Sequence, residues 1–247
     1  GTHIVVIDIA SHKVTGNIDL GHGARPHCII YNKKDNLLYV TTELDKAITI
    51  IDPQTLKVVG TIPTGQPESH MLVISHDGER GYTSNVGPGT VSVLDMKARK
   101  TITVITIAPG AQRISISNDD SMVFTSDQAQ PRLAVIDTAT NKIKTWVDLP
   151  GAGYGTASTK DGKTLLVAMP SSNKVAVVDL SALKVVRTID VPAAPQEILV
   201  RPDGLVAYVS CNASAKIAAI DLQGWKVTSL IDAGPGADGL AWAANLN

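Results

Sequence analysis

An aliphatic residue followed by aspartate recurs six times along this chain at a nearly constant spacing. Successive aspartates lie 44, 43, 42, 42 and 42 residues apart, and each is followed five positions later by a lysine. The aspartates are Asp8, Asp52, Asp95, Asp137, Asp179 and Asp221. Short apolar stretches that alternate with turns on a period of this length are typical of an array of small sheets, one per repeat. Because the repeat runs from end to end, we expect residues 1–247 to form a single domain.

One repeat contains four segments with strand character, as residues 29–62 illustrate. Residues 29–31, 37–41, 47–51 and 57–62 are rich in β-branched and aromatic residues and are separated by polar turns. We name these segments strands A to D. They predict an all-β fold, a β-propeller with four-stranded antiparallel blades of about 42 residues each. In the C–D turn, Asp52 is expected to bond the backbone two residues on and to pair with Lys57.

The two ends of the chain bear on the number of blades. Leu240 is equivalent to Ile29, so strand B of the last repeat would lie beyond Asn247, and the chain begins within strand C, just before Asp8. Six A, C and D strands but only five B strands are therefore expected. We predict six blades, with the termini meeting in the closing blade. The alternative is part of a seven-bladed propeller with another repeat in front.

The ends of the B strands carry a family resemblance. They read Tyr39-Val40-Thr41-Thr42, Tyr82-Thr83-Ser84-Asn85, Phe124-Thr125-Ser126-Asp127, Leu166-Val167-Ala168-Met169 and Tyr208-Val209-Ser210-Cys211. This pattern resembles the YVTN family of β-propeller repeats, which occurs in bacterial and archaeal surface and periplasmic proteins. The resemblance implies a propeller fold and a periplasmic, secreted or cell-surface location. It says little about activity, because propellers host both binding and catalysis.

Composition excludes several classes of function. The net charge is −1, and the 22 Lys and Arg residues are dispersed, so no nucleic-acid surface is predicted. No apolar run approaches the roughly 20 residues of a membrane span. The two cysteines, Cys28 and Cys211, lie in different repeats and form no Cys-x-x-Cys metal motif.

A candidate site follows from the expected topology. In a propeller the A strands line the central channel, and one face carries the D–A and B–C connections. The opposite face has nearly the same turns in every repeat, so we expect function on the variable face. One equivalent position at the start of strand A is polar in all six repeats: His27, His70, Gln112, Tyr154, Gln196 and Asp238. The next position adds Arg113 and Glu197, and the B–C loops add Glu43, Asn85 and Asp127.

These residues suggest three kinds of chemistry. His27, His70 and Glu43 come from adjacent blades and form a ligand set suited to one divalent metal ion such as zinc. Glu197 and Asp238 are candidates for proton transfer. The candidate ligand-binding residues are Gln112, Arg113, Tyr154, Gln196, Asn85 and Asp127. In the simpler alternative, these polar strand ends are only solvated.

The leading functional prediction is an extracytoplasmic binding or interaction module. Its channel-mouth face would bind a small polar molecule or a protein or glycan partner, with no cofactor beyond one metal ion. The alternative is a metal-dependent enzyme, a hydrolase or lyase acting on a small polar substrate such as a lactone. The chain has no Cys-x-x-Cys-His haem motif and few aromatic residues, so electron transfer ranks last.

Overall fold

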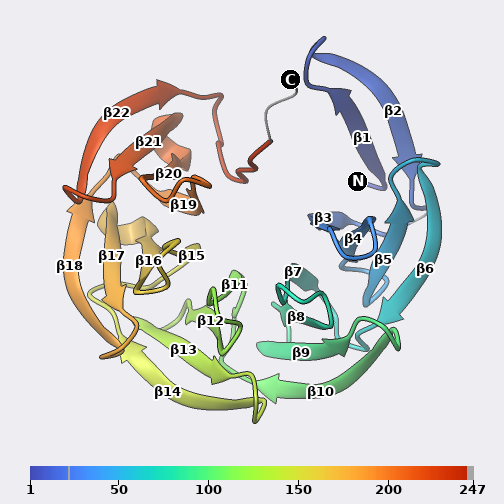
Figure 1. Cartoon of the computed structure of the whole chain (residues 1–247), viewed down its shortest axis with the longest axis horizontal. Helices are drawn as coiled ribbons and strands as arrows, with labels where there is room; N and C mark the ends of the chain where they lie inside the picture. Colours follow the sequence, from blue (N-terminus) through green and yellow to red (C-terminus); the bar gives the residue numbers. More distant parts are fainter. Residues whose placement is uncertain (22, 244–247) are drawn as a thin grey trace. The chain divides into compact units, whose positions relative to one another are not determined.

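The computed structural model describes residues 1–21 and 23–243, and its regular structure is almost entirely β (Figure 1). The chain divides into two compact units, one ending at Gln112 and the other beginning at Arg113. In the part of the chain that is described, the helical segments are two 3-10 turns, η1 (Pro170–Ser172) and η2 (Asn212–Ser214). No helix of these residues is long and apolar enough to cross a membrane.

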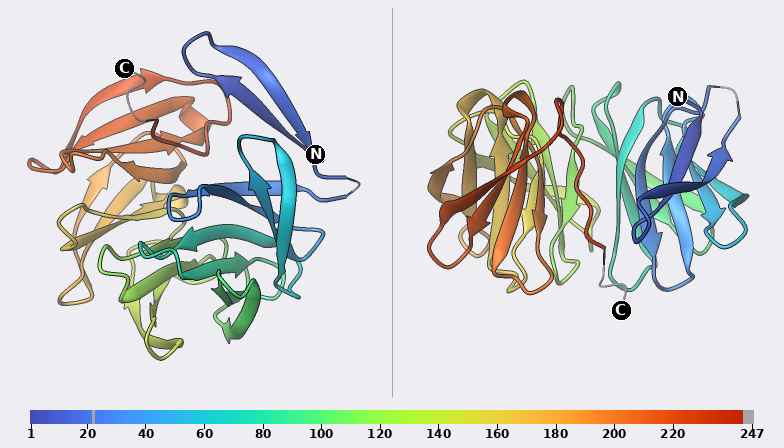
Figure 2. Two further views of the ribbon diagram at one scale, coloured as in Figure 1. Left: turned by 45° about the vertical axis from the view of Figure 1, so that its right-hand side comes forward. Right: turned by 90° about the horizontal axis from the view of Figure 1, so that it is seen from above.

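The first unit holds three antiparallel sheets. Two have four strands, in the orders β3-β4-β5-β6 and β10-β9-β8-β7, and the third is the hairpin β1-β2, dark blue in Figure 2. The strands are β1 (His3–Asp8), β2 (Lys13–Asp19), β3 (Pro26–Asn32), β4 (Leu37–Thr42), β5 (Ala47–Asp52), β6 (Lys57–Pro63), β7 (Ser69–Ile74), β8 (Arg80–Asn85), β9 (Thr90–Asp95) and β10 (Lys100–Thr106).

The second unit holds three four-stranded antiparallel sheets, β11 to β14, β15 to β18 and β19 to β22, each in chain order. The strands are β11 (Ile114–Ile116), β12 (Met122–Asp127), β13 (Arg132–Asp137), β14 (Lys142–Asp148), β15 (Thr156–Ser158), β16 (Thr164–Met169), β17 (Lys174–Asp179), β18 (Lys184–Asp190), β19 (Pro195–Val200), β20 (Val206–Cys211), β21 (Lys216–Asp221) and β22 (Lys226–Asp232).

The predicted all-β fold with four-stranded blades is confirmed, because the A to D strands of residues 29–62 correspond to β3 to β6. The predicted count of six blades is wrong. The described residues form five complete blades, with β1-β2 as a small extra sheet. The expected strand A at Leu240 is also absent, since residues 233–243 contain no strand. A strand needs a hydrogen-bonded neighbour, and none of the described strands pairs with residues 233–243. The single-domain prediction, with meeting termini, stays a prediction.

The periodic aspartates fold the C–D turns. Asp52 Oδ1 accepts a hydrogen bond from the Gln54 backbone N–H at 2.8 Å, and the other five aspartates each accept one from a backbone N–H two or three residues on. Leu56, at the end of the turn, takes a left-handed conformation with φ 55°. Asp52 and Lys57 are partners across the strand register, yet no ion pair joins any of the six Asp–Lys pairs within the described residues. The predicted turn bond is therefore confirmed, while the predicted ion pair is not formed.

The core of each blade comes from the middle strands. Tyr39, Tyr82 and Phe124 of the B strands are at most 2% exposed, and the C strands bury aliphatic residues on both faces. Tyr39 keeps its hydroxyl satisfied by donating to Asp35 at 2.6 Å, which together with burial raises the pKa of the phenol. Full burial of such a side chain contributes about 1.5–3 kcal/mol, so each of these three aromatic residues stabilises its own blade.

Acid should weaken the A–B turns. Asp119 accepts hydrogen bonds from the Ser117 hydroxyl and from Ser121, which lower its pKa from 3.8 to about 2. A carboxylate with a depressed pKa in the folded state stabilises the protein above its unfolded pKa, and this contribution is lost as pH falls toward 2. Asp119→Asn should lower the free energy of unfolding at pH 6 by less than about 1 kcal/mol, because solvent screens an exposed group. In urea unfolding, the difference in free energy of unfolding between Asp119→Asn and the wild type should be smaller at pH 2.5 than at pH 6. The exposed control Asp148→Asn should have nearly the same free energy of unfolding as the wild type at both pH values.

Candidate functional site

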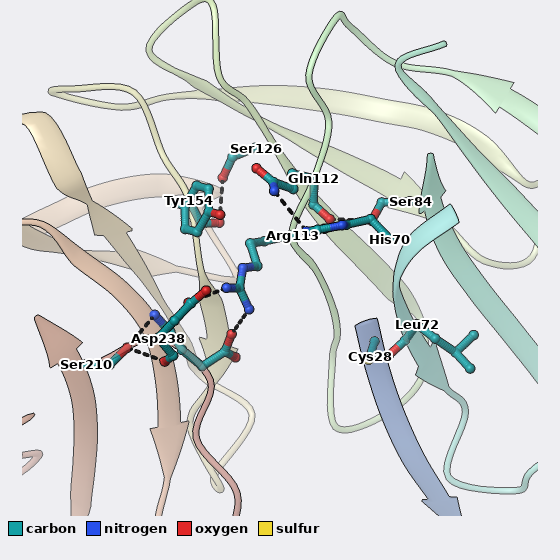
Figure 3. A network of polar contacts seen from close by, with 11 residues as sticks. Cys28, His70, Leu72, Ser84, Gln112, Arg113, Ser126, Tyr154, Ser210 and Asp238 are labelled. Atoms are coloured by element: carbon teal, nitrogen blue, oxygen red, sulfur yellow. Dashed lines mark hydrogen bonds and ion pairs between the residues drawn. The ribbon is translucent and has the colours of Figure 1, made fainter. Parts of the chain in front are cut away.

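A repeated hydroxyl fixes the main chain at four of the six polar positions predicted to start an A strand. It lies two residues after the bulky strand-B residue and donates to the backbone carbonyl of that position in the next blade (Figure 3). The pairs are Thr41 with His70, Ser84 with Gln112, Ser126 with Tyr154, and Ser210 with Asp238. Ala168 has no hydroxyl, and there the Gly155 N–H donates to the Gln196 carbonyl at 3.1 Å. The hydroxyl contacts only the backbone carbonyl of the anchored residue. The side chain of that residue can therefore differ between repeats.

In the first unit, three predicted metal ligands come together. One ligand atom each from His27, Glu43 and His70 lies within 4.8 Å of the other two. His27 lies on β3 and is exposed, while His70 on β7 is 6% exposed and Glu43, just after β4, is 2% exposed. The imidazole rings of His27 and His70 stack with centroids 3.6 Å apart and planes tilted by 31°. Two imidazoles and a carboxylate at this spacing can hold a metal ion.

Glu43 and His70 are each held from two sides. The Glu43 carboxylate contacts His70 Nδ1 through Oε1, and Oε2 lies 3.0 Å from Arg25 Nε. The other ring nitrogen of His70, Nε2, lies 2.8 Å from Gln112 Nε2 (Figure 3). No motif points to Arg25, which occupies a loop position with a left-handed backbone, φ 48°. Gln112 was predicted to bind a ligand, and the structure makes it a partner of a candidate metal ligand.

In the second unit, a buried arginine joins three other predicted residues. Arg113, 4% exposed, forms ion pairs with Glu197 and Asp238 (Figure 3). Its guanidinium carbon lies 5.0 Å from the centre of the Tyr154 ring, within the range of a cation–π contact. The two carboxylates and one guanidinium carry a formal charge of −1 when all are ionised. Asp238 is the more open carboxylate, with 42% of its side chain exposed against 21% for Glu197.

The charges of this cluster are coupled. Burial raises the pKa of Glu197, Arg113 opposes that rise, and Asp238 adds to it. Burial also opposes the charge of Arg113, but Glu197 and Asp238 outweigh it and raise the Arg113 pKa. The arginine therefore stays charged and holds both carboxylates. The predicted proton-transfer role of Glu197 and Asp238 stays a prediction, and it would require a carboxylate to leave Arg113.

Asn85 and Asp127 are placed differently from the expectation that they line an open site. Asn85 is fully buried and exchanges hydrogen bonds with the hydroxyls of Ser69, Thr90 and Ser92 at 2.7–3.0 Å. Asp127 is 1% exposed and accepts from backbone N–H groups of its own loop and from Arg132 Nε at 2.9 Å. Buried polar groups need hydrogen-bond partners, and both side chains find theirs within their own blades.

The repeated four-stranded sheets define this molecule as a β-propeller repeat protein. Its sequence matches the family described as Domain of unknown function (DUF5074) over residues 2–194, and the chain belongs to that family. No curated protein matches the sequence. Among solved structures, it is similar to Kuenenia stuttgartiensis hydrazine synthase, with a TM-score of 0.75 and 19% identity, covering 84% of this chain and 66% of that one. A likeness at this identity shows the fold alone, and the YVTN resemblance stays a prediction.

Proposed function

We propose that this protein is a binding module that holds a divalent transition-metal ion at the site built from His27, Glu43 and His70. The observation that supports it is the spacing of the three side chains, whose ligand atoms lie within 4.8 Å of one another. Mixed nitrogen and oxygen donors suit zinc and similar ions, whereas calcium and magnesium prefer oxygen alone. The residues present therefore fit a zinc-type ion by their chemistry.

The proposed role of the ion is to bind a polar partner. A site with few protein ligands keeps coordination positions open, and these can accept an oxygen or nitrogen atom of a small molecule, a protein or a glycan. Binding is favoured over hydrolysis because the carboxylate at this site, Glu43, is 2% exposed and lies between His70 and Arg25, so a substrate proton has no open path to it. The YVTN resemblance supports an extracytoplasmic location for this module.

Metal uptake tests the proposal directly. After chelator treatment and addition of Zn²⁺, elemental analysis and calorimetry should show about one bound ion per chain. The double variant His27→Ala/His70→Ala should lose this binding by at least about 100-fold, since two of three donors are gone. The single variant His76→Ala, on an exposed turn, is the matched control and should bind as the wild type does. Circular dichroism would establish that each variant is folded. Wild-type protein that takes up no zinc, or a double variant that binds it normally, would overturn the proposal.

A further inference from the structure

Each oxygen of Glu43 lies against a nitrogen of another side chain, although only Oε1 is hydrogen-bonded. Oε1 contacts His70 Nδ1, and Oε2 lies 3.0 Å from Arg25 Nε. Glu43 is 2% exposed, so its charge depends on these partners in place of water. An ion bound at Oε1 would have to displace His70, and an ion bound at Oε2 would lie beside the positive guanidinium of Arg25, whose Nε is 3.0 Å from that oxygen. Direct coordination by Glu43 is therefore the costlier arrangement.

The contact with Glu43 also decides which nitrogen of His70 can bind a metal ion. An ionised carboxylate only accepts hydrogen bonds, so Nδ1 must carry the hydrogen. In neutral imidazole the lone pair then lies on Nε2, which faces the Gln112 amide at 2.8 Å. Histidine ligands commonly donate their second N–H to a carboxylate, which fixes the tautomer and strengthens the ligand. His70 has this arrangement, with Glu43 as the carboxylate.

The neighbours of His70 can complete a site on the Nε2 side. The His27 ring stacks against the His70 ring with centroids 3.6 Å apart, and His27 is exposed, so its side chain has room to turn a ring nitrogen toward His70 Nε2. Gln112 already contacts Nε2, and its backbone carbonyl is held by Ser84. A half-turn of its amide would bring the oxygen to the position of the nitrogen, and that oxygen can bind a metal ion.

We infer that the ion binds His70 through Nε2, together with His27 and the Gln112 amide oxygen, while Glu43 is a positioning residue that orients His70. This inference rests on the proposed function and assigns the roles within that site. It predicts opposite effects for two substitutions. Gln112→Glu should tighten zinc binding by about 10-fold or more, because a carboxylate is the better zinc ligand. Glu43→Gln keeps an acceptor for Nδ1–H and should weaken binding by about 10–100-fold without abolishing it, as substitution of an outer-shell partner does.

Calorimetry with Zn²⁺ on the full chain would test both variants, with Glu79→Gln on an exposed turn as the matched control. ¹⁵N NMR of the histidine rings in the zinc-loaded wild type gives a second readout. His70 should keep a protonated Nδ1 and show the shift of a metal-bound Nε2. A metal-bound Nδ1, complete loss of binding in Glu43→Gln, or no gain in Gln112→Glu would each overturn the inference. These results are distinct from failure of the proposed function, in which the wild type takes up no zinc.

Discussion

Replacing Arg113 with methionine should lower the free energy of unfolding by about 3 kcal/mol. The side chain is 5% exposed and pairs with Glu197 and Asp238, so its removal leaves two carboxylates, one 21% and one 42% exposed, without their cation. Breaking a buried ion pair from one side typically costs about 3–5 kcal/mol, and the exposure of Asp238 places the estimate at the lower end. Arg113 opposes the rise in the Glu197 pKa, so this pKa should rise further in the variant.

Urea unfolding followed by circular dichroism would measure the loss. The exposed Arg80→Met on β8 is the control and should change stability by less than about 0.5 kcal/mol. The double variant Arg113→Met/Glu197→Gln should recover part of the loss, because an uncharged amide tolerates burial better than an unpaired carboxylate. If the stability lost in the double variant equalled the sum of the losses in the two single variants, the charge explanation would be wrong and lost packing would account for the effect.

Gly155→Ala should be nearly as damaging, at about 3 kcal/mol. A Cβ atom at this position would lie 2.1 Å from the Gln196 carbonyl oxygen and 3.1 Å from the Glu197 Cα, which are both main-chain atoms. The Gly155 N–H also donates to that carbonyl, so the neighbouring backbones cannot separate without breaking a hydrogen bond. Overpacking usually costs about 1–3 kcal/mol, and a clash with backbone belongs at the upper end because no side chain can rotate away.

Gly234→Ala provides the matched control for this prediction. A Cβ at Gly234 would meet nothing within 4 Å, and its backbone is not left-handed, so the same substitution should leave stability nearly unchanged. Thermal and urea unfolding of both variants would give the comparison. Equal stability of Gly155→Ala and the wild type would show that the two backbones can move apart at low cost.

The strands of the blades could be predicted because their signals are local. Alternating apolar residues and an aspartate that bonds the next backbone N–H groups act within about ten residues, and β3 to β6 lie where residues 29–62 predicted them. The strand predicted at Leu240 was wrong for a reason outside its own sequence, because a strand forms only beside a hydrogen-bonded partner. The ion pair between Asp52 and Lys57 was predicted from their proximity along the chain. The Asp52 carboxylate instead bonds the backbone of its own turn.

The repeat, the turns and the polar position at the start of each A strand could be predicted from the sequence, because all three follow from residue types at fixed spacing. The tertiary structure decided the partners of those polar side chains. Glu43 meets His70 across 27 residues, and Arg113 meets Glu197 across 84 and Asp238 across 125. Such contacts depend on how neighbouring blades pack, and the backbone anchor that holds each position does not depend on its side chain. The same spacing therefore places a candidate metal ligand in one blade and a carboxylate bound to arginine in another.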